Sequence, residues 1–171
     1  SGAVAAASLP DPAIAQGVRR WKMATAWPKS FPGLGTGAQR IADAITRMSE
    51  GALEVKLYAS GELVPAFEIF DAVREGTAEL GHAGAAYWVG KNKSFAFFAV
   101  VPAGLVAQEQ NAWLDYGGGQ ALWDEIYGEY GLKAFAAGNT GTQMGGWSTA
   151  PSRASTTSPA CACASPGLPA R

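Results

Sequence analysis

Few residues in this sequence have the type and spacing needed for chemistry, and the most suggestive group is a glycine-rich stretch. The letters "GLGTGA", residues 33–38, fit the dinucleotide-binding pattern G-x-G-x-x-G/A, in which backbone N–H groups at a helix start hold a pyrophosphate. Five residues separate this stretch from the preceding strand pattern, and the next strand pattern has Glu54 at its beginning rather than an acid at its end. A Rossmann-type NAD-dependent oxidoreductase therefore stays an alternative, and we favour a close strand-to-helix loop.

Other catalytic arrangements are missing from the sequence. His82 is the single histidine and lies in a buried-strand context, "LGHAGA", where a lone imidazole is more often structural than a base. Asp124, Glu125 and Glu129 fall on a helical pattern as a hydrated face, and the C-x-C pair of cysteines has no further metal ligands near it. The sequence predicts that the protein is not an enzyme and has no catalytic residue.

Aromatic and polar side chains instead follow the predicted strands. Because the carboxyl ends of parallel strands line the ligand crevice of an open sheet, these residues are expected to converge on a pocket with an aromatic rim. The residues are Trp27 after the first strand, Tyr87 and Trp88 after the third, and Asn139, Gln143 and Trp147 after the last.

The elements that must position these side chains alternate between strand and helix patterns. Strand patterns cover 19–27, 53–59, 77–85 and 132–138, with another apolar segment at 95–102; helix patterns cover 36–51, 65–76 and 108–131, the last with a glycine interruption. The first helix is predicted to bury Ile41, Ile45 and Met48, and the second strand Leu53, Val55 and Leu57. This order predicts an α/β domain with a mostly parallel sheet.

Composition narrows the classes of partner. The chain has 171 residues, 48% of them hydrophobic, which suffices for one domain with a core. Its 13 basic and 14 acidic residues include no basic block, so nucleic acid is not an expected partner. No stretch reaches the ~18 consecutive apolar residues of a membrane span.

Three longer stretches resemble a known family. They are "WKMATAWPKSFPGLGTGAQRIADAITRMSEG", "LYASGELVPAFEIFDAVREGTAELGHAGAAYW" and "GNTGTQMGGW". From about residue 21 to 147 they resemble the amino-terminal half of solute-binding proteins of tripartite ATP-independent periplasmic (TRAP) transporters, in the branch that binds 2-oxo acids and related carboxylates. Such proteins are two-domain α/β clamshells about twice this length, so the resemblance implies a periplasmic-binding-protein-like domain that ends before most of the second one.

The resemblance also implies a site and partners. Gln143 would contact the solute and a bound cation such as sodium or calcium, and Tyr87 and Trp88 would lie beside the solute. Trp27 and Asn139 are added from their strand-end positions. The expected partners are a small carboxylate, such as a 2-oxo or 2-hydroxy acid, and the small and large membrane subunits of the permease. A homodimer and a non-catalytic interaction module stay open.

The two ends of the chain differ from the part between them. Residues 1–16 are expected to be the remnant of a secretory signal, with a small-x-small pattern at Ala13 to Ala15, and the protein is expected in the periplasm. Residues 17–147 are the expected first domain. Residues 148–171 are expected to be a disordered tail that results from a frameshift. Codons can be chosen for this tail such that one base added after the Trp147 codon changes the translation to "FHRAIKSLDDLAGLRMRIPGLAGE". That string restores a family-like segment whose second arginine, the solute-carboxylate clamp of the family, falls where Ala164 stands. The chain is therefore expected to be truncated and impaired in binding.

Overall fold

The computed structural model describes residues 17–99, 101 and 104–141, and its centre is a parallel three-stranded sheet. The strands are β1 (Arg19–Thr25), β2 (Leu53–Tyr58) and β3 (Leu80–His82), arranged in the order β2-β1-β3. Trp21 pairs with Val55 on one side of β1, and Thr25 pairs with His82 on the other. The predicted α/β class with a parallel sheet is confirmed, and the carboxyl ends of all three strands meet at one edge.

Helix α1 (Leu34–Met48) covers one face of the sheet. The side chains between them form an aliphatic cluster whose buried members are Met23, Ala38, Ala42 and Val55, and Ile41, Ile45, Leu53 and Leu57 pack against them. The predicted inward faces are therefore confirmed except at Met48, which is 78% exposed. Met48 is the last helical residue, just before the turn that leads to β2.

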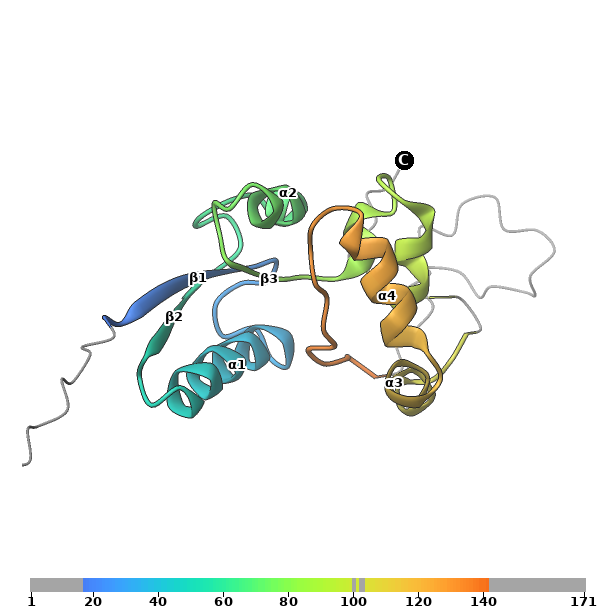
Figure 1. The fold of residues 1–171 in the computed structure, drawn as a ribbon, viewed down its shortest axis with the longest axis horizontal. Helices are drawn as coiled ribbons and strands as arrows, with labels where there is room; N and C mark the ends of the chain where they lie inside the picture. The colour runs from blue at the N-terminus through green and yellow to red at the C-terminus, as the bar shows by residue number, and fades with distance from the viewer. Residues whose placement is uncertain (1–16, 100, 102–103, 142–171) are drawn as a thin grey trace, which may run out of the picture.

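Helix α2 (Ile69–Arg74) covers the opposite face, as Figure 1 shows. The predicted helix begins after Pro65, but its first turn is a separate 3-10 helix, η1 (Ala66–Glu68). Contact between α2 and the sheet is close, because a methyl group added at Gly81 would lie 2.8 Å from a methyl carbon of Ile69. The sheet is thus enclosed by helices on both sides.

Beyond β3 the chain folds into short helices around aromatic side chains. These elements are the 3-10 helices η2 (Ala85–Trp88) and η3 (Lys93–Phe98), and the α-helices α3 (Ala107–Tyr116) and α4 (Gly119–Gly128). The Phe95 ring centroid lies 4.8 Å from that of Tyr127 and 5.7 Å from that of Phe70. This aromatic cluster joins α2 to the region after the sheet.

One predicted element in this region, the strand at 132–138, is wrong. The helix pattern over 108–131, predicted with a glycine interruption, forms two helices, because the chain turns sharply at Gly117 and at Gly118, which has a φ of 82°. The first residues of the apolar segment at 95–102 belong to the 3-10 helix η3. Residues 132–138 are not a strand: Leu132 and Ala134 pack on the aromatic cluster, and the Ala134 carbonyl accepts from Gln120 Nε2 rather than from a neighbouring strand.

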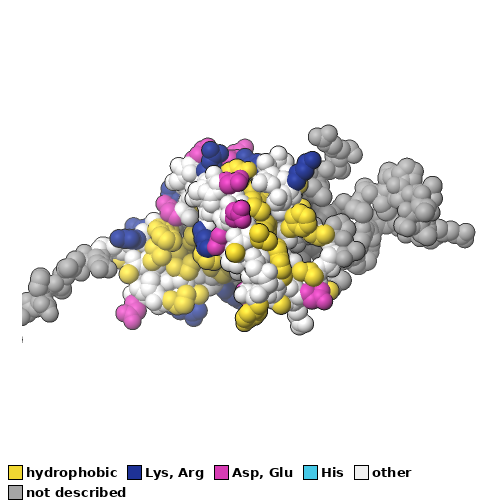
Figure 2. Space-filling model, turned by 45° about the vertical axis from the view of Figure 1, so that its right-hand side comes forward, with side chains coloured by type: hydrophobic (Ala, Val, Ile, Leu, Met, Phe, Trp, Pro, Cys, Tyr) yellow, Lys and Arg dark blue, Asp and Glu magenta, His cyan; other side chains and the backbone are white. Residues whose placement is uncertain are grey.

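Part of the apolar surface beside the aromatic cluster is open. A groove of about 290 Å³ is lined by Ser94, Phe97, Phe98, Trp113, Leu122 and Ile126. Figure 2 shows hydrophobic side chains gathered on one face of the molecule.

Within the described residues, none of the helices combines the length and apolar character needed to cross a bilayer. The expectations for 1–16 and for 148–171 lie outside the described residues.

Candidate functional site

The candidate site begins where β1 and β3 end side by side. Thr25 and His82, the last residues of these strands, are 2% and 8% exposed, and the Thr25 hydroxyl lies 3.2 Å from His82 Nδ1. The backbone pairing continues one step further, because the Ala26 N–H donates to the His82 carbonyl at 3.0 Å. This edge is the position at which solutes bind in open parallel sheets.

Aromatic rings from three segments gather next to this edge. The Trp27 indole meets the His82 imidazole edge to face at 5.0 Å between ring centroids, and lies 6.4 Å from the Tyr87 ring. Phe67, which follows β2 and is largely exposed, contacts Tyr87 at 5.2 Å. We call Phe67, Trp27, His82 and Tyr87 the aromatic wall. The structure therefore brings Trp27 and Tyr87 together, as the sequence predicts.

Two members of the aromatic wall were not among the predicted site residues. The sequence context of His82 predicts a structural role, and no site role is predicted for Phe67. The signal for Phe67 is available in the sequence, because it follows the second strand as Trp27 and Tyr87 follow the first and third. Its inclusion depends on the path of residues 59–66, which returns it to the same edge.

The other predicted site residues have different positions. The Trp88 ring is buried in the aromatic cluster, and its Nε1 donates to the Tyr127 hydroxyl at 3.1 Å, so its contact with Tyr87 is on the inner side. Asn139 is exposed, and its side-chain oxygen accepts from the Gly141 N–H. Gln143 and Trp147 lie outside the described residues. The roles proposed for these residues at a solute site stay predictions.

The aromatic wall is electrically neutral near pH 7. Burial lowers the pKa of His82 below its usual value, and partial burial raises the pKa of the Tyr87 hydroxyl. A neutral aromatic surface can pack against the carbon skeleton of a small solute, but it cannot balance the charge of a carboxylate. A partner for that charge must come from residues outside the wall.

The described residues contain no cluster of acidic, histidine and cysteine side chains suited to a metal ion. Within them, no three His, Cys, Asp or Glu side chains come together in a way that could hold a metal ion. Hard cations such as calcium prefer several oxygen ligands, and the aromatic wall offers only the Tyr87 hydroxyl.

The glycine-rich stretch forms the start of α1, with Gly33 just before the helix, and packs closely against the loop that precedes it. Gly33 has a φ of 79°, and a methyl group added at Gly35 would lie 2.6 Å from the Pro28 carbonyl oxygen. The N–H groups of Leu34 and Thr36 donate to carbonyls of the same loop, those of Pro32 and Phe31. These donors, which a pyrophosphate would need, already have partners. The geometry favours the structural interpretation of this motif over dinucleotide binding.

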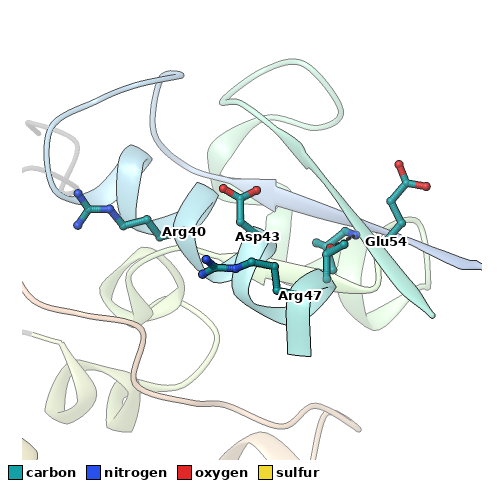
Figure 3. Close-up of a pocket in the computed structure, with 6 residues that line it drawn as sticks. Arg40, Asp43, Arg47 and Glu54 are labelled. Atoms are coloured by element: carbon teal, nitrogen blue, oxygen red, sulfur yellow. Dashed lines mark hydrogen bonds between the residues drawn. The ribbon is translucent and has the colours of Figure 1, made fainter. Parts of the chain in front are cut away.

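A separate groove lies beside α1, away from the strand ends. It has a volume of about 670 Å³ and is lined by Arg40, Asp43, Thr46, Arg47, Glu54 and Val55. Figure 3 shows its four charged side chains extending from α1 and β2 at the outside of the sheet. Two arginines and two acids on an exposed surface give no preference for one sign of ligand charge. We therefore place the candidate site at the aromatic wall.

The fold, together with the candidate site at the carboxyl ends of the strands, defines an α/β solute-binding domain. Comparison with known proteins gives its family. Residues 23–153 match the family described as bacterial extracellular solute-binding protein, family 7. A monocarboxylate 2-oxoacid-binding periplasmic protein of Nostoc sp. is 46% identical over 128 residues, which are 75% of this chain and 35% of that protein. The chain belongs to the bacterial extracellular solute-binding protein family 7.

Solved structures agree with this assignment. A TRAP periplasmic solute-binding protein from Colwellia psychrerythraea, with bound calcium and pyruvate, is 42% identical with a TM-score of 0.74. One from Pseudoalteromonas atlantica, with sodium and pyruvate, is 40% identical with the same TM-score. Both alignments cover 77% of this chain and 40% of the other. The relatives are solute-binding proteins of TRAP transporters rather than enzymes, and this chain spans well under half of their length.

Proposed function

We propose that this chain supplies the first α/β part of a TRAP-type receptor that captures a small 2-oxo or 2-hydroxy carboxylate outside the cytoplasm. The observation that carries the proposal is the aromatic wall at the carboxyl edge of the sheet, in a chain 46% identical to a 2-oxoacid-binding relative over 128 residues. The relative is periplasmic by its name, so we extend the proposal to export of this chain. A permease with a small and a large membrane subunit is the proposed recipient of the solute.

Individual roles follow from this proposal. Trp27 and Tyr87 pack against the solute carbon skeleton, with Trp88 supporting Tyr87 from the core side. Gln143 and Asn139 are the proposed polar contacts, and Gln143 also a contact of a bound cation. Support for the cation comes from the two relatives with pyruvate, which hold calcium in one case and sodium in the other. We also propose residues 17–147 as the limits of the first domain.

Calorimetry with pyruvate, with and without calcium, tests the proposal on the full chain. Because Ala164 stands where the family has its clamp arginine, we expect weak binding by the unchanged protein, and a further loss of about ten-fold or more in affinity for Tyr87→Ala, as is usual when an aromatic anchor is truncated. The matched control is Phe97→Ala, which removes an exposed aromatic ring from another part of the molecule and should leave binding unchanged.

Thermal unfolding with NAD separates the alternatives. A ligand present at one hundred times its Kd stabilises the folded state by about 2.7 kcal/mol, which is readily detected as a raised midpoint. Stabilisation by NAD and not by pyruvate would support the oxidoreductase alternative. Indifference to both ligands in a folded monomer would instead support the interaction module, and either result would overturn the proposal.

A further inference from the structure

The orientation of the Trp27 indole depends on two neighbours at the end of the sheet. Trp27 lies just after β1, and its backbone is held by two hydrogen bonds: its carbonyl accepts from the Ser60 N–H at 3.1 Å, and its N–H donates to the Thr25 hydroxyl at 3.4 Å. Its indole ring contacts the rings of both His82 and Tyr87. The backbone is therefore fixed independently of the ring, whose direction is set by the two aromatic contacts.

The Thr25 hydroxyl connects the backbone of Trp27 to the imidazole. A hydroxyl carries one hydrogen and two acceptor lone pairs, so it can accept from the Trp27 N–H and donate to His82 Nδ1 at the same time. We assign this arrangement, which places the imidazole hydrogen on Nε2 and fixes the rotation of the ring. The planes of the His82 imidazole and the Trp27 indole then meet at an angle of 63°.

We propose that His82 is a positioning residue of the solute site, which holds the Trp27 indole in place through its hydrogen bond to Thr25. This inference deepens the proposed function and rests on it, because Trp27 is assigned to the solute site there. His82 itself lies behind the indole, almost fully buried, and is given no contact with the solute. Its effect on binding acts through Trp27.

A hydrogen-bonded imidazole differs from simple core packing in one testable respect. A core residue is replaceable by any side chain of similar volume, whereas a positioning residue needs both its ring and its hydrogen bond. Thr25→Val and Thr25→Ser form the sharpest pair, because valine has nearly the shape of threonine without the hydroxyl, and serine keeps the hydroxyl. His82→Phe keeps a ring beside Trp27 and removes the bond to Thr25.

Fluorine spectroscopy of the full chain labelled with fluorotryptophan reports on Trp27 directly. The sequence has six tryptophans, and the Trp27→Phe variant assigns the resonance of interest. We expect this resonance to shift or broaden in Thr25→Val and in His82→Phe, and to keep its position in Thr25→Ser. Tyr127→Phe is the control for general destabilisation, because it removes the hydroxyl that accepts from Trp88 in the core, away from Trp27.

Pyruvate affinity gives a second readout. His82→Phe should weaken binding about ten-fold, comparable to truncating a contact residue, while Tyr127→Phe leaves it close to that of the unchanged protein. An unchanged Trp27 resonance in both Thr25→Val and His82→Phe would overturn the positioning role, as would a shift of the same size in Tyr127→Phe. If the unchanged protein does not bind pyruvate, the proposed function fails, and the fluorine spectra still decide whether His82 positions Trp27.

Discussion

The aliphatic and the aromatic clusters of this protein are built in different ways. The aliphatic cluster has four buried members, all between residues 23 and 55, and they belong to one strand-helix-strand unit. The aromatic cluster gathers buried side chains from Ala24 to Tyr127. Strand β1 contributes to both, because Met23 and Ala24 point to opposite faces. A local unit is thus joined through one strand to a region held together by long-range contacts.

The two clusters also differ in how their side chains fill space. Alanines at the centre of α1 bring the helix close to the sheet, so this cluster depends on small size. The aromatic cluster depends on large rings that meet edge to face, such as Phe95 with Tyr127. Removing volume should therefore damage the aromatic cluster most, and adding volume the aliphatic one.

The largest expected effect is that of Phe95→Ala. Phe95 is fully buried among aromatic rings, so the change leaves a cavity and should lower the free energy of unfolding by about 3 to 5 kcal/mol. Phe97→Ala, on the same 3-10 helix, removes a ring that is 61% exposed and should cost much less. Urea denaturation measures both. Equal losses would show that the aromatic cluster is not packed as described.

A larger side chain should reduce stability most at Ala38. This residue is fully buried where α1 meets the sheet, so Ala38→Leu should cost about 1 to 3 kcal/mol through overpacking. The neighbouring Gln39 is exposed, and Gln39→Leu should change stability little. A tolerated Ala38→Leu, measured by the same denaturation, would mean that α1 can move away from the sheet.

Two glycines in the first turn of α1 should show smaller effects of opposite sign. Gly35→Ala places a methyl group against the Pro28 carbonyl and should destabilise by about 1 kcal/mol or more. Gly37→Ala meets nothing within 4 Å and should stabilise the helix by up to about 1 kcal/mol. Thermal melts of the two variants decide the point, and a stabilising Gly35→Ala would contradict the close loop.

The smallest effect concerns pH and His82. Burial lowers its folded-state pKa below the unfolded value of 6.5, so unfolded chains take up the proton first as the pH falls. Stability is therefore full above pH 6.5 and declines below it, until the folded-state pKa is reached. Melts between pH 7.5 and 5, compared with those of His82→Asn, isolate this contribution. An imidazole that titrates at or above 6.5 by NMR would refute it.

Much of the fold could be predicted from the sequence. The alternation in 19–27 and 53–59, and the spacing of Ile41 and Ile45, indicate the β1-α1-β2 unit, because both elements bury a face against their neighbours in the chain. The positions of Trp27 and Tyr87 after predicted strands likewise predicted that the two side chains lie close together. Residues 132–138 show the limit: Leu132 and Ala134 alternate as in a strand, but a strand also needs a paired neighbour, which no local pattern reports.

The sequence by itself therefore determined the family, the local order of strands and helices, and the position of aromatic residues at the strand ends. Each of these depends on patterns among residues that are close together in the chain. The tertiary structure decided which rings face the candidate site and which enter the core. Tyr87 and Trp88 are neighbours in sequence, yet one joins the aromatic wall and the other donates to Tyr127. That choice depends on a hydroxyl 39 positions away, and the contact of His82 with Thr25 depends on a strand pairing across 57 positions. Only folding brings such groups within hydrogen-bond distance.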